Sequence, residues 1–256
     1  TSTVTLSATG GTGTYQFSKD GGTTFVSSNV FAGLAAGNYS FIVKDANNCL
    51  VTVPVSITEP SLLTLSASKT DILCFGETST VTLTATGGTG AYQFSKDGGV
   101  TFVSSNSFSG LVAGSYSFIV KDANNCSVTV PVSIAEPSLL TLSASKTDIL
   151  CSGGTSIVTL SATGGTGAYQ FSKDGGTTFV SSNVFAGLAA GNYSFIVKDA
   201  NNCLMTVQLS ITEPSLLTLS ATKTNILCFG ETSTVTLSAT GGTGTYQFSK
   251  DGGTTF

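Results

Sequence analysis

Apolar and polar residues alternate along most of this chain, and the alternation predicts short β-strands. Residues 63–67, 81–85 and 128–134 place Leu, Val, Ala or Ile at every second position, so one face of each strand is apolar. Residues 92–94 and 116–120 are rich in aromatic and β-branched side chains and predict two more strands. No stretch shows the three-and-four apolar spacing of a helix.

Turn signals separate these strands. The segments Gly-Gly-Thr-Gly at 87–90, Asp-Gly at 97–98 and Asp-Ala-Asn-Asn at 122–125 all favour tight turns. Residues 101–108 hold one or two further strands. Roughly seven short strands with a turn every 8–12 residues predict an all-β fold, a small two-sheet β-sandwich of the Ig-like or fibronectin-III-like type.

One block recurs along the chain without change of length: the segment Thr-Gly-Gly-Thr-Gly begins at positions 9, 86, 163 and 240. A fixed period of about 77 residues indicates one structural unit used in series, as in spacers, stalks and multivalent surfaces. We expect the chain to start and stop inside a unit of a longer array. The expected domains are a partial repeat lacking its first strand, two full repeats and a truncated repeat, at 1–59, 60–136, 137–213 and 214–256.

The linker between repeats is the tripeptide Glu-Pro-Ser, at 59–61, 136–138 and 213–215. Proline restricts its own backbone and that of the residue before it, and a tripeptide is too short for a flexible tether. We therefore expect the sandwiches to follow one another as an extended, semi-rigid rod.

One tyrosine in each repeat stands two positions after a glycine, at the entry to a strand. This spacing is that of a tyrosine corner, whose hydroxyl bonds a backbone group a short way upstream. The predicted structural corners are Tyr39, Tyr116 and Tyr193.

Composition argues against several functions. The chain has no His, Trp or Arg, and its net charge is −4. Without histidine no Ser-His-Asp or Cys-His arrangement forms, and without clustered Lys and Arg a nucleic-acid partner is not expected. Asp71 and Glu77 are conceivable paired carboxylates, but they lie beside turns and the third repeat has Gly154 in place of the glutamate. We expect no enzyme activity, catalytic residue or cofactor, and no membrane span.

The six cysteines alternate between a short and a long spacing, at positions 49, 74, 126, 151, 203 and 228. Each repeat has two, which favours disulfides and an oxidising compartment. Pairing within each repeat is the favoured expectation; Cys49 and Cys228 then have partners outside this chain. Pairing across the linker, or free thiols, are the alternatives, and zinc is disfavoured because no close Cys pair exists. The within-repeat bonds would be Cys74–Cys126 and Cys151–Cys203; the cross-linker bonds would be Cys49–Cys74, Cys126–Cys151 and Cys203–Cys228.

Two turns offer hard oxygen atoms for calcium. Asp122, Asn124 and Asn125 share one loop and Asp97 lies in another, but Asp and Asn are also ordinary turn residues and no complete calcium-loop signature is present. We expect no metal. A Lys–Asn isopeptide cross-link is a further, disfavoured alternative.

Several landmarks together resemble the SprB repeat. They are Ile-Leu-Cys-Phe-Gly at 72–76, Ala-Thr-Gly-Gly-Thr-Gly-Ala-Tyr at 85–92, Leu-Val-Ala-Gly-Ser-Tyr at 111–116, Val-Lys-Asp-Ala-Asn-Asn-Cys at 120–126 and Ile-Ala-Glu-Pro at 134–137. The chain departs from many such repeats in having Phe94 where they carry Trp.

The resemblance implies the repeat region of a giant surface adhesin of gliding Bacteroidetes, exported by the type IX secretion system. It implies an extracellular, cell-surface location and no catalytic residues. Two functions follow: a passive filament, which we favour, or an array of weak carbohydrate-binding repeats acting by avidity. The expected partners are neighbouring repeats and, through other regions, surface polysaccharide or the motility and secretion machinery.

Overall fold

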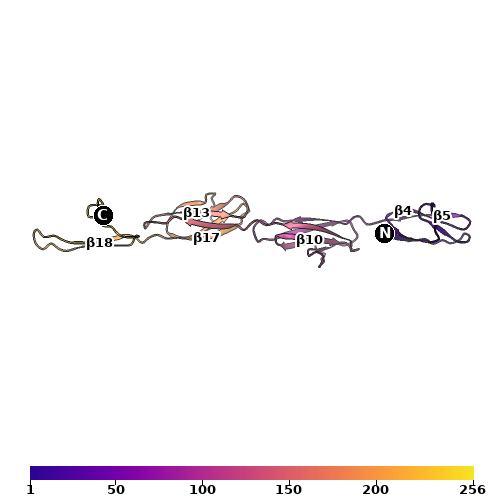
Figure 1. The fold of residues 1–256 in the computed structure, drawn as a ribbon, viewed down its shortest axis with the longest axis horizontal. Coiled ribbons are helices and arrows are strands. Elements are labelled where there is room, and N and C mark those ends of the chain that lie inside the picture. The colour runs from indigo at the N-terminus through magenta and orange to yellow at the C-terminus, as the bar shows by residue number, and fades with distance from the viewer. The chain divides into compact units, whose positions relative to one another are not determined.

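The computed structural model describes residues 1–256 and is built of β-strands, without a helix (Figure 1). The chain forms two compact units, and the strands of the second repeat contribute to both. The first unit comprises Thr1–Ala67, Leu83–Asn106 and Ser117–Val130; the second comprises Ser68–Thr82, Ser107–Tyr116 and Pro131–Phe256.

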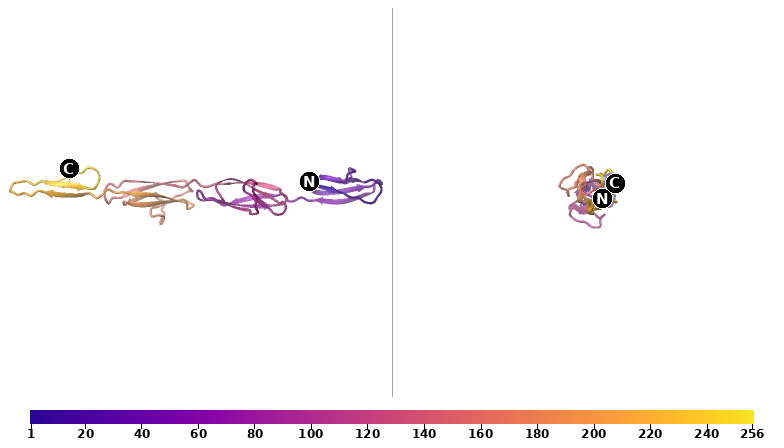
Figure 2. Two further views of the ribbon diagram at one scale, coloured as in Figure 1. Left: turned by 90° about the horizontal axis from the view of Figure 1, so that it is seen from below. Right: turned by 90° about the vertical axis from the view of Figure 1, so that its left-hand side faces the viewer.

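The third repeat, in the second unit, shows the complete fold. It consists of two three-stranded antiparallel sheets, with strand orders β12-β13-β15 and β14-β16-β17. In the views of Figures 1 and 2 these strands run along one common direction. Their bounds are β12 (Thr141–Lys146), β13 (Ser156–Thr163), β14 (Gln170–Ser172), β15 (Val184–Leu188), β16 (Gly191–Lys198) and β17 (Leu204–Ile211).

The core of this repeat lies between its two sheets. Val158 and Leu160 of β13 are fully buried at alternate positions, and so are Phe195 and Val197 of β16. Side chains at alternate positions of a strand point to the same face, so the alternation in the sequence becomes the buried face of each sheet. All four belong to one apolar cluster, which shows that the two sheets pack face to face as a β-sandwich.

The other repeats use the same strands as far as they extend. The second repeat has sheets β6-β7-β9 and β8-β10-β11, the first has β1-β3 and β2-β4-β5, and the fourth has β18-β19. No helix is present that is long and apolar enough to cross a membrane. The bounds are β1 (Ser2–Thr5), β2 (Gln16–Ser18), β3 (Val30–Leu34), β4 (Gly37–Lys44), β5 (Leu50–Ile57), β6 (Thr64–Lys69), β7 (Ser79–Thr86), β8 (Gln93–Ser95), β9 (Ser107–Leu111), β10 (Gly114–Lys121), β11 (Ser127–Ile134), β18 (Thr218–Lys223) and β19 (Val235–Thr240).

Each complete repeat has six strands, one fewer than the sequence suggests. Residues 101–108 contribute only the start of β9, and the pairing before it is reduced to an isolated bridge between Phe94 and Val103. In the loop before this bridge, the backbone N–H groups of Gly99 and Thr101 donate to the side chains of Ser95 and Asp97 and not to a neighbouring strand.

The register of β16 and β17 gives a repeat two distinct ends. Gly191 pairs with Ile211, and at the other end of the same two strands Lys198 pairs with Leu204. The turn 199–203 therefore lies at one end, which we call the leading end. The glycine turn 164–167 lies there too, because Thr166 donates its backbone N–H to Asp199. The loop 147–155 and the turn 189–190 lie at the opposite, trailing end, because Ser156 pairs with Leu188 there.

Candidate functional site: the linked ends of successive repeats

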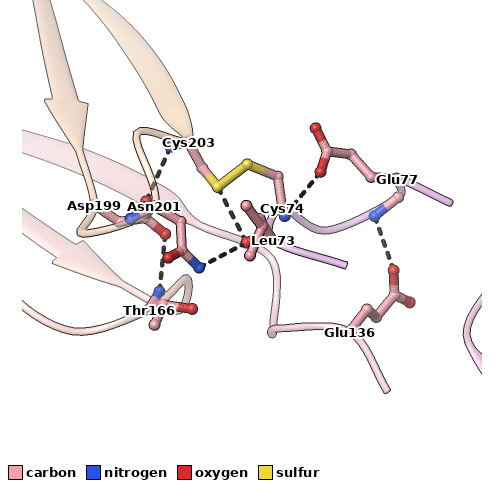
Figure 3. Close-up of a disulfide and its surroundings, with 9 residues drawn as sticks. Leu73, Cys74, Glu77, Glu136, Thr166, Asp199, Asn201 and Cys203 are labelled. Atoms are coloured by element: carbon pink, nitrogen blue, oxygen red, sulfur yellow. Dashed lines mark hydrogen bonds between the residues drawn. A yellow bond between two sulfur atoms is a disulfide. The ribbon is translucent and has the colours of Figure 1, made fainter. Parts of the chain in front are cut away.

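A disulfide joins Cys74 to Cys203, with their Cα atoms 5.7 Å apart and a sequence separation of 129 (Figure 3). Cys74 lies in the trailing-end loop of the second repeat and Cys203 in the leading-end turn of the third. Both belong to the second compact unit. The bond therefore links two successive repeats. The remaining cysteines, Cys49, Cys126, Cys151 and Cys228, are exposed free thiols.

This pairing corrects the expectation of a bond within each repeat. Cys151 and Cys203 lie at opposite ends of the third repeat, separated by the length of the strand β16, roughly 26 Å. A disulfide needs Cα atoms within about 7 Å, so these two cysteines cannot bond to each other. Cys74 bonds Cys203 rather than Cys126, and the cross-linker alternative is also wrong, since Cys126 and Cys151 are both free.

The turn that carries Cys203 is shaped by the buried carboxylate of Asp199. Its Oδ1 accepts the backbone N–H groups of Asn201 and Cys203, each at 2.9 Å, and its Oδ2 accepts that of Thr166 at 2.8 Å. Between Asn201 and Cys203, Asn202 has a φ of 66°, a left-handed conformation that asparagine tolerates better than most residues. The Asp-Ala-Asn-Asn sequence therefore fixes the direction in which the cysteine leaves the turn.

The equivalent turn of the second repeat has the same geometry around Asp122. Burial raises the pKa of this carboxyl, but the N–H groups of Thr89, Cys126 and Asn124 outweigh it and hold the pKa below its usual value. Both oxygens of this candidate calcium ligand thus accept hydrogen bonds from backbone N–H groups. The shared shape of the two turns is explained by these hydrogen bonds without a metal ion.

The loop that carries Cys74 is held by two glutamates. Glu77, one of the two conceivable paired carboxylates, accepts the N–H of Cys74 at 3.2 Å. This contact is local and structural. Glu136, from the Glu-Pro-Ser linker, accepts the N–H of Gly76 at 2.8 Å. The ammonium of Lys69 also donates to the carbonyl of Ser133. These contacts fasten the start of the linker to the cysteine loop of its own repeat.

Two contacts accompany the disulfide across the junction. The side-chain amide of Asn201 donates to the carbonyl oxygen of Leu73 at 3.1 Å, and Cys203 Sγ lies 3.4 Å from the same oxygen (Figure 3). Asn201 and Cys203 are partly buried, whereas the equivalent Asn124 and Cys126 are exposed. The two loops therefore make non-covalent contacts in addition to the disulfide.

The end of the linker is fastened to the leading end of the next repeat. Gly165 donates its N–H to the carbonyl of Ser138 at 2.8 Å, and Gly88 and Gly242 make the same bond to Ser61 and Ser215. A Cβ on Gly164 would lie 1.9 Å from the carbonyl oxygen of Leu139, so only glycine fits at this approach. The linker is consequently anchored on both sides.

The tyrosine corners have the geometry that the sequence predicts. Tyr39, Tyr116 and Tyr193 donate their hydroxyl hydrogens to the backbone carbonyls of Ala35, Val112 and Ala189, at 3.1, 3.0 and 3.1 Å. A second hydroxyl contact was not anticipated: Tyr92 and Tyr169 donate to Gly87 and Gly164, each at 2.7 Å. The signal was available, since each such tyrosine follows the Gly-Gly turn at a fixed spacing.

The Ser-Lys-Asp-Gly-Gly turn is a separate hydrogen-bonded loop. In the third repeat Ser172 and Thr178 donate their hydroxyls to Asp174 at 2.6 Å each, and these bonds lower the pKa of that carboxyl well below its usual value. Lys198 lies 4.6 Å above the ring of Phe179 beside this loop. The carboxylate is committed to the turn, and Asp97 occupies the same position in the second repeat.

The junction thus gathers four of the five landmarks that carried the resemblance. They are the Cys loop and Glu-Pro of one repeat, and the Gly-Gly-Thr-Gly turn and Asp-Ala-Asn-Asn-Cys turn of the next. The SprB repeat model matches residues 66–101 and 220–255, two segments that stand twice the repeat period apart. Two segments of the chain are thus similar to the SprB repeat.

Two solved structures align with most of the chain at low similarity. The eight N-terminal Ig domains of Down Syndrome Cell Adhesion Molecule align over 78% of the chain with 15% identity and a TM-score of 0.27. The Bacteroides ovatus mixed-linkage glucan utilization protein SGBP-B, in complex with a heptasaccharide, aligns over 78% with 14% identity and a TM-score of 0.18. The chain spans 37% and 61% of those two proteins. No curated protein matches it.

Proposed function

We propose that these SprB repeats form the stalk of a cell-surface adhesin, a passive filament that sets reach and transmits force during surface attachment and gliding motility. The protein is extracellular and exported, and the repeats themselves are not an enzyme. A structural disulfide supports an oxidising compartment, because the cytosol keeps thiols reduced.

The observation that carries this proposal is the covalent link between Cys74 and Cys203. A repeat that only displayed a binding site would need no bond to its neighbour. A repeat under tension gains from one, since the junction then cannot separate by losing non-covalent contacts alone. The linker contacts of Glu136 and Gly165 serve the same end by fastening the tripeptide to both repeats.

The aromatic residues argue against the alternative, a multivalent carbohydrate-binding array. Sugar sites usually present exposed aromatic rings as a platform. In the complete repeats Tyr92 and Tyr169 are partly buried, and their hydroxyls are bonded to backbone carbonyls. Phe94 and Phe171 beside them are buried. No stacking platform is formed by these four rings.

The proposal is tested on the chain and on cells that produce it. Isotope-labelled chain titrated with surface polysaccharides to millimolar sugar is expected to show no amide shifts, while antibody to the repeats labels intact cells. Shortening the array by whole periods is expected to reduce attachment and spreading without loss of export. Saturable shifts of residues on one repeat face would favour the carbohydrate-binding array, and absence of surface label would overturn the proposal.

A further inference from the structure

The two halves of the Cys74–Cys203 link recur at ends of repeats where no partner cysteine is present. Cys151 and Cys228 occupy the position of Cys74, one and two periods later. Cys126 and Cys49 occupy the position of Cys203, one and two periods earlier. All four are exposed thiols. For each of them, a partner at the same sequence separation as the Cys74–Cys203 pair would fall outside positions 1–256.

The trailing-end loop of the third repeat has the same backbone as the linked loop of the second. Gly153 donates to Glu213 at 2.6 Å as Gly76 does to Glu136 at 2.8 Å. The carbonyl of Cys151 accepts the N–H of the third residue after it at 3.0 Å, and that of Cys74 does so at 3.2 Å. The loop at Cys151 is therefore already in the conformation that holds a disulfide at Cys74.

The leading-end turn is likewise unchanged by linkage. Asp122 accepts the N–H groups of Asn124, Cys126 and Thr89 at 2.9 Å each, and the matching distances around Asp199 in the linked turn are 2.9, 2.9 and 2.8 Å. What differs is exposure: Leu150 is 77% exposed, whereas the equivalent Leu73, beside the disulfide, is 50% exposed. The Cys151 loop and the Cys126 turn therefore already have the conformations of the linked pair. Leu150 is exposed where the turn of a following repeat would pack.

We propose that Cys151 and Cys126 are inter-repeat cross-linking sites. In an array that continues the period, Cys151 bonds the second cysteine of the following repeat and Cys126 bonds the first cysteine of the preceding one. Every junction then has one disulfide with the geometry of Cys74–Cys203. Each bond forms when two thiols lose two protons and two electrons to a disulfide oxidant such as oxidised glutathione, which is reduced to two thiols.

Such links overlap, because each repeat is bonded at both ends to different neighbours. A covalent path then runs from Cys74 to Cys203, along the chain to Cys228, and across the next link. The chain from Cys203 to Cys228 can extend to at most about 85 Å. It runs from the leading end of one repeat to the trailing end of the next, so it spans the length of two repeats. A sandwich with strands of this length and its end loops is roughly 35 Å long, so two of them already fill most of that path. The cross-links make the array nearly inextensible, and the strands between the cysteines of a repeat carry little tension.

The test uses the full chain lengthened at its C-terminus by a copy of residues 180–256. This copy continues the period and supplies a second Cys203, at the sequence separation from Cys151 that Cys203 has from Cys74. After folding in a glutathione redox buffer, peptide mapping without reduction is expected to find two links, one between Cys74 and Cys203 and one between Cys151 and the copy of Cys203.

The matched control is the Cys151→Ser variant of the lengthened chain. It is expected to keep the Cys74–Cys203 link and to leave the copy of Cys203 free. Intact Cys74–Cys203 together with a free Cys151, or Cys151 bonded to any other cysteine, would overturn the proposal.

Discussion

The hydroxyl of Tyr193 donates a hydrogen bond of 3.1 Å to the carbonyl oxygen of Ala189, closing the turn at the trailing end of the third repeat. The bond is exposed to solvent, so water replaces part of it when it is lost. We predict that Tyr193→Phe lowers the free energy of unfolding by about 0.5–1 kcal/mol. Urea unfolding of the chain measures this, and Tyr169→Phe, which removes a part-buried bond, is expected to cost more. A Tyr193→Phe protein as stable as the parent would argue against a structural role for the corner.

The close approach of Gly164 to Leu139 predicts a large effect of a small substitution. Gly164→Ala adds a Cβ at 1.9 Å from a backbone oxygen, in a residue with a φ of 79°. The clash and the left-handed conformation together should cost about 3 kcal/mol or more. Gly187→Ala is the matched control, because Gly187 has a φ of 73° and open space around its Cβ position. It should cost only about 1 kcal/mol. Equal losses in the two variants, measured by urea unfolding, would mean that the linker moves away freely.

The Asp174 turn predicts a pH dependence of stability. Hydrogen bonds from Ser172 and Thr178 lower the pKa of this carboxyl in the folded state. Their contribution is therefore present above the unfolded pKa of about 3.9 and is lost as the pH falls through the lower folded value. We expect the melting temperature to fall less between pH 6 and pH 2 in Thr178→Val than in the parent chain.

Thr177→Val is the control for that comparison. The hydroxyl of Thr177 donates to the backbone carbonyl of Asp174 and does not contact the carboxylate. The melting temperature of Thr177→Val should fall with pH as steeply as that of the parent, even if all its values are shifted. If both threonine variants flatten the profile alike, the acid sensitivity does not come from the Asp174 carboxylate.

The Cys74–Cys203 bond predicts a specific change in length under force. Pulling the oxidised chain by its ends leaves the stretch between these cysteines, a sequence separation of 129, out of the extended path. Reduction is expected to release about 440 Å of additional contour length. Two within-repeat bonds would release about 350 Å instead, and a length insensitive to reductant would mean that no bond forms. Cys74→Ser is the control, since it should show the full length without reductant.

From the sequence of the Glu-Pro-Ser linkers alone we propose that the array is an extended, semi-rigid rod in solution. Small-angle scattering of the oxidised chain is expected to give a maximum dimension of about 130 Å, because the chain spans just over three sandwiches of roughly 35–40 Å each. Glu136→Gln weakens the bond to Gly76 and should broaden the distance distribution without unfolding the sandwiches. A compact globule in the parent chain would contradict the idea.

The sequence by itself determined the repeat, the sandwich and the local turns. Val158 and Leu160 are buried because alternation assigns them to one face, and a face is a property of a single strand. The Tyr193 corner and the Asp199 turn were likewise readable, since their partners lie within a short distance along the chain.

Only the tertiary structure decided which cysteines meet. The sequence spacing assigns Cys151 and Cys203 to one domain. The pairing of β13 with β15 and of β16 with β17 places them at its opposite ends. The tertiary structure also decided that Glu136, Gly165 and Asn201 converge on one junction. Periodicity says which side of a strand a residue occupies. It does not say which loops of successive repeats face each other, because that depends on how strand direction and linker anchoring orient one sandwich upon the next.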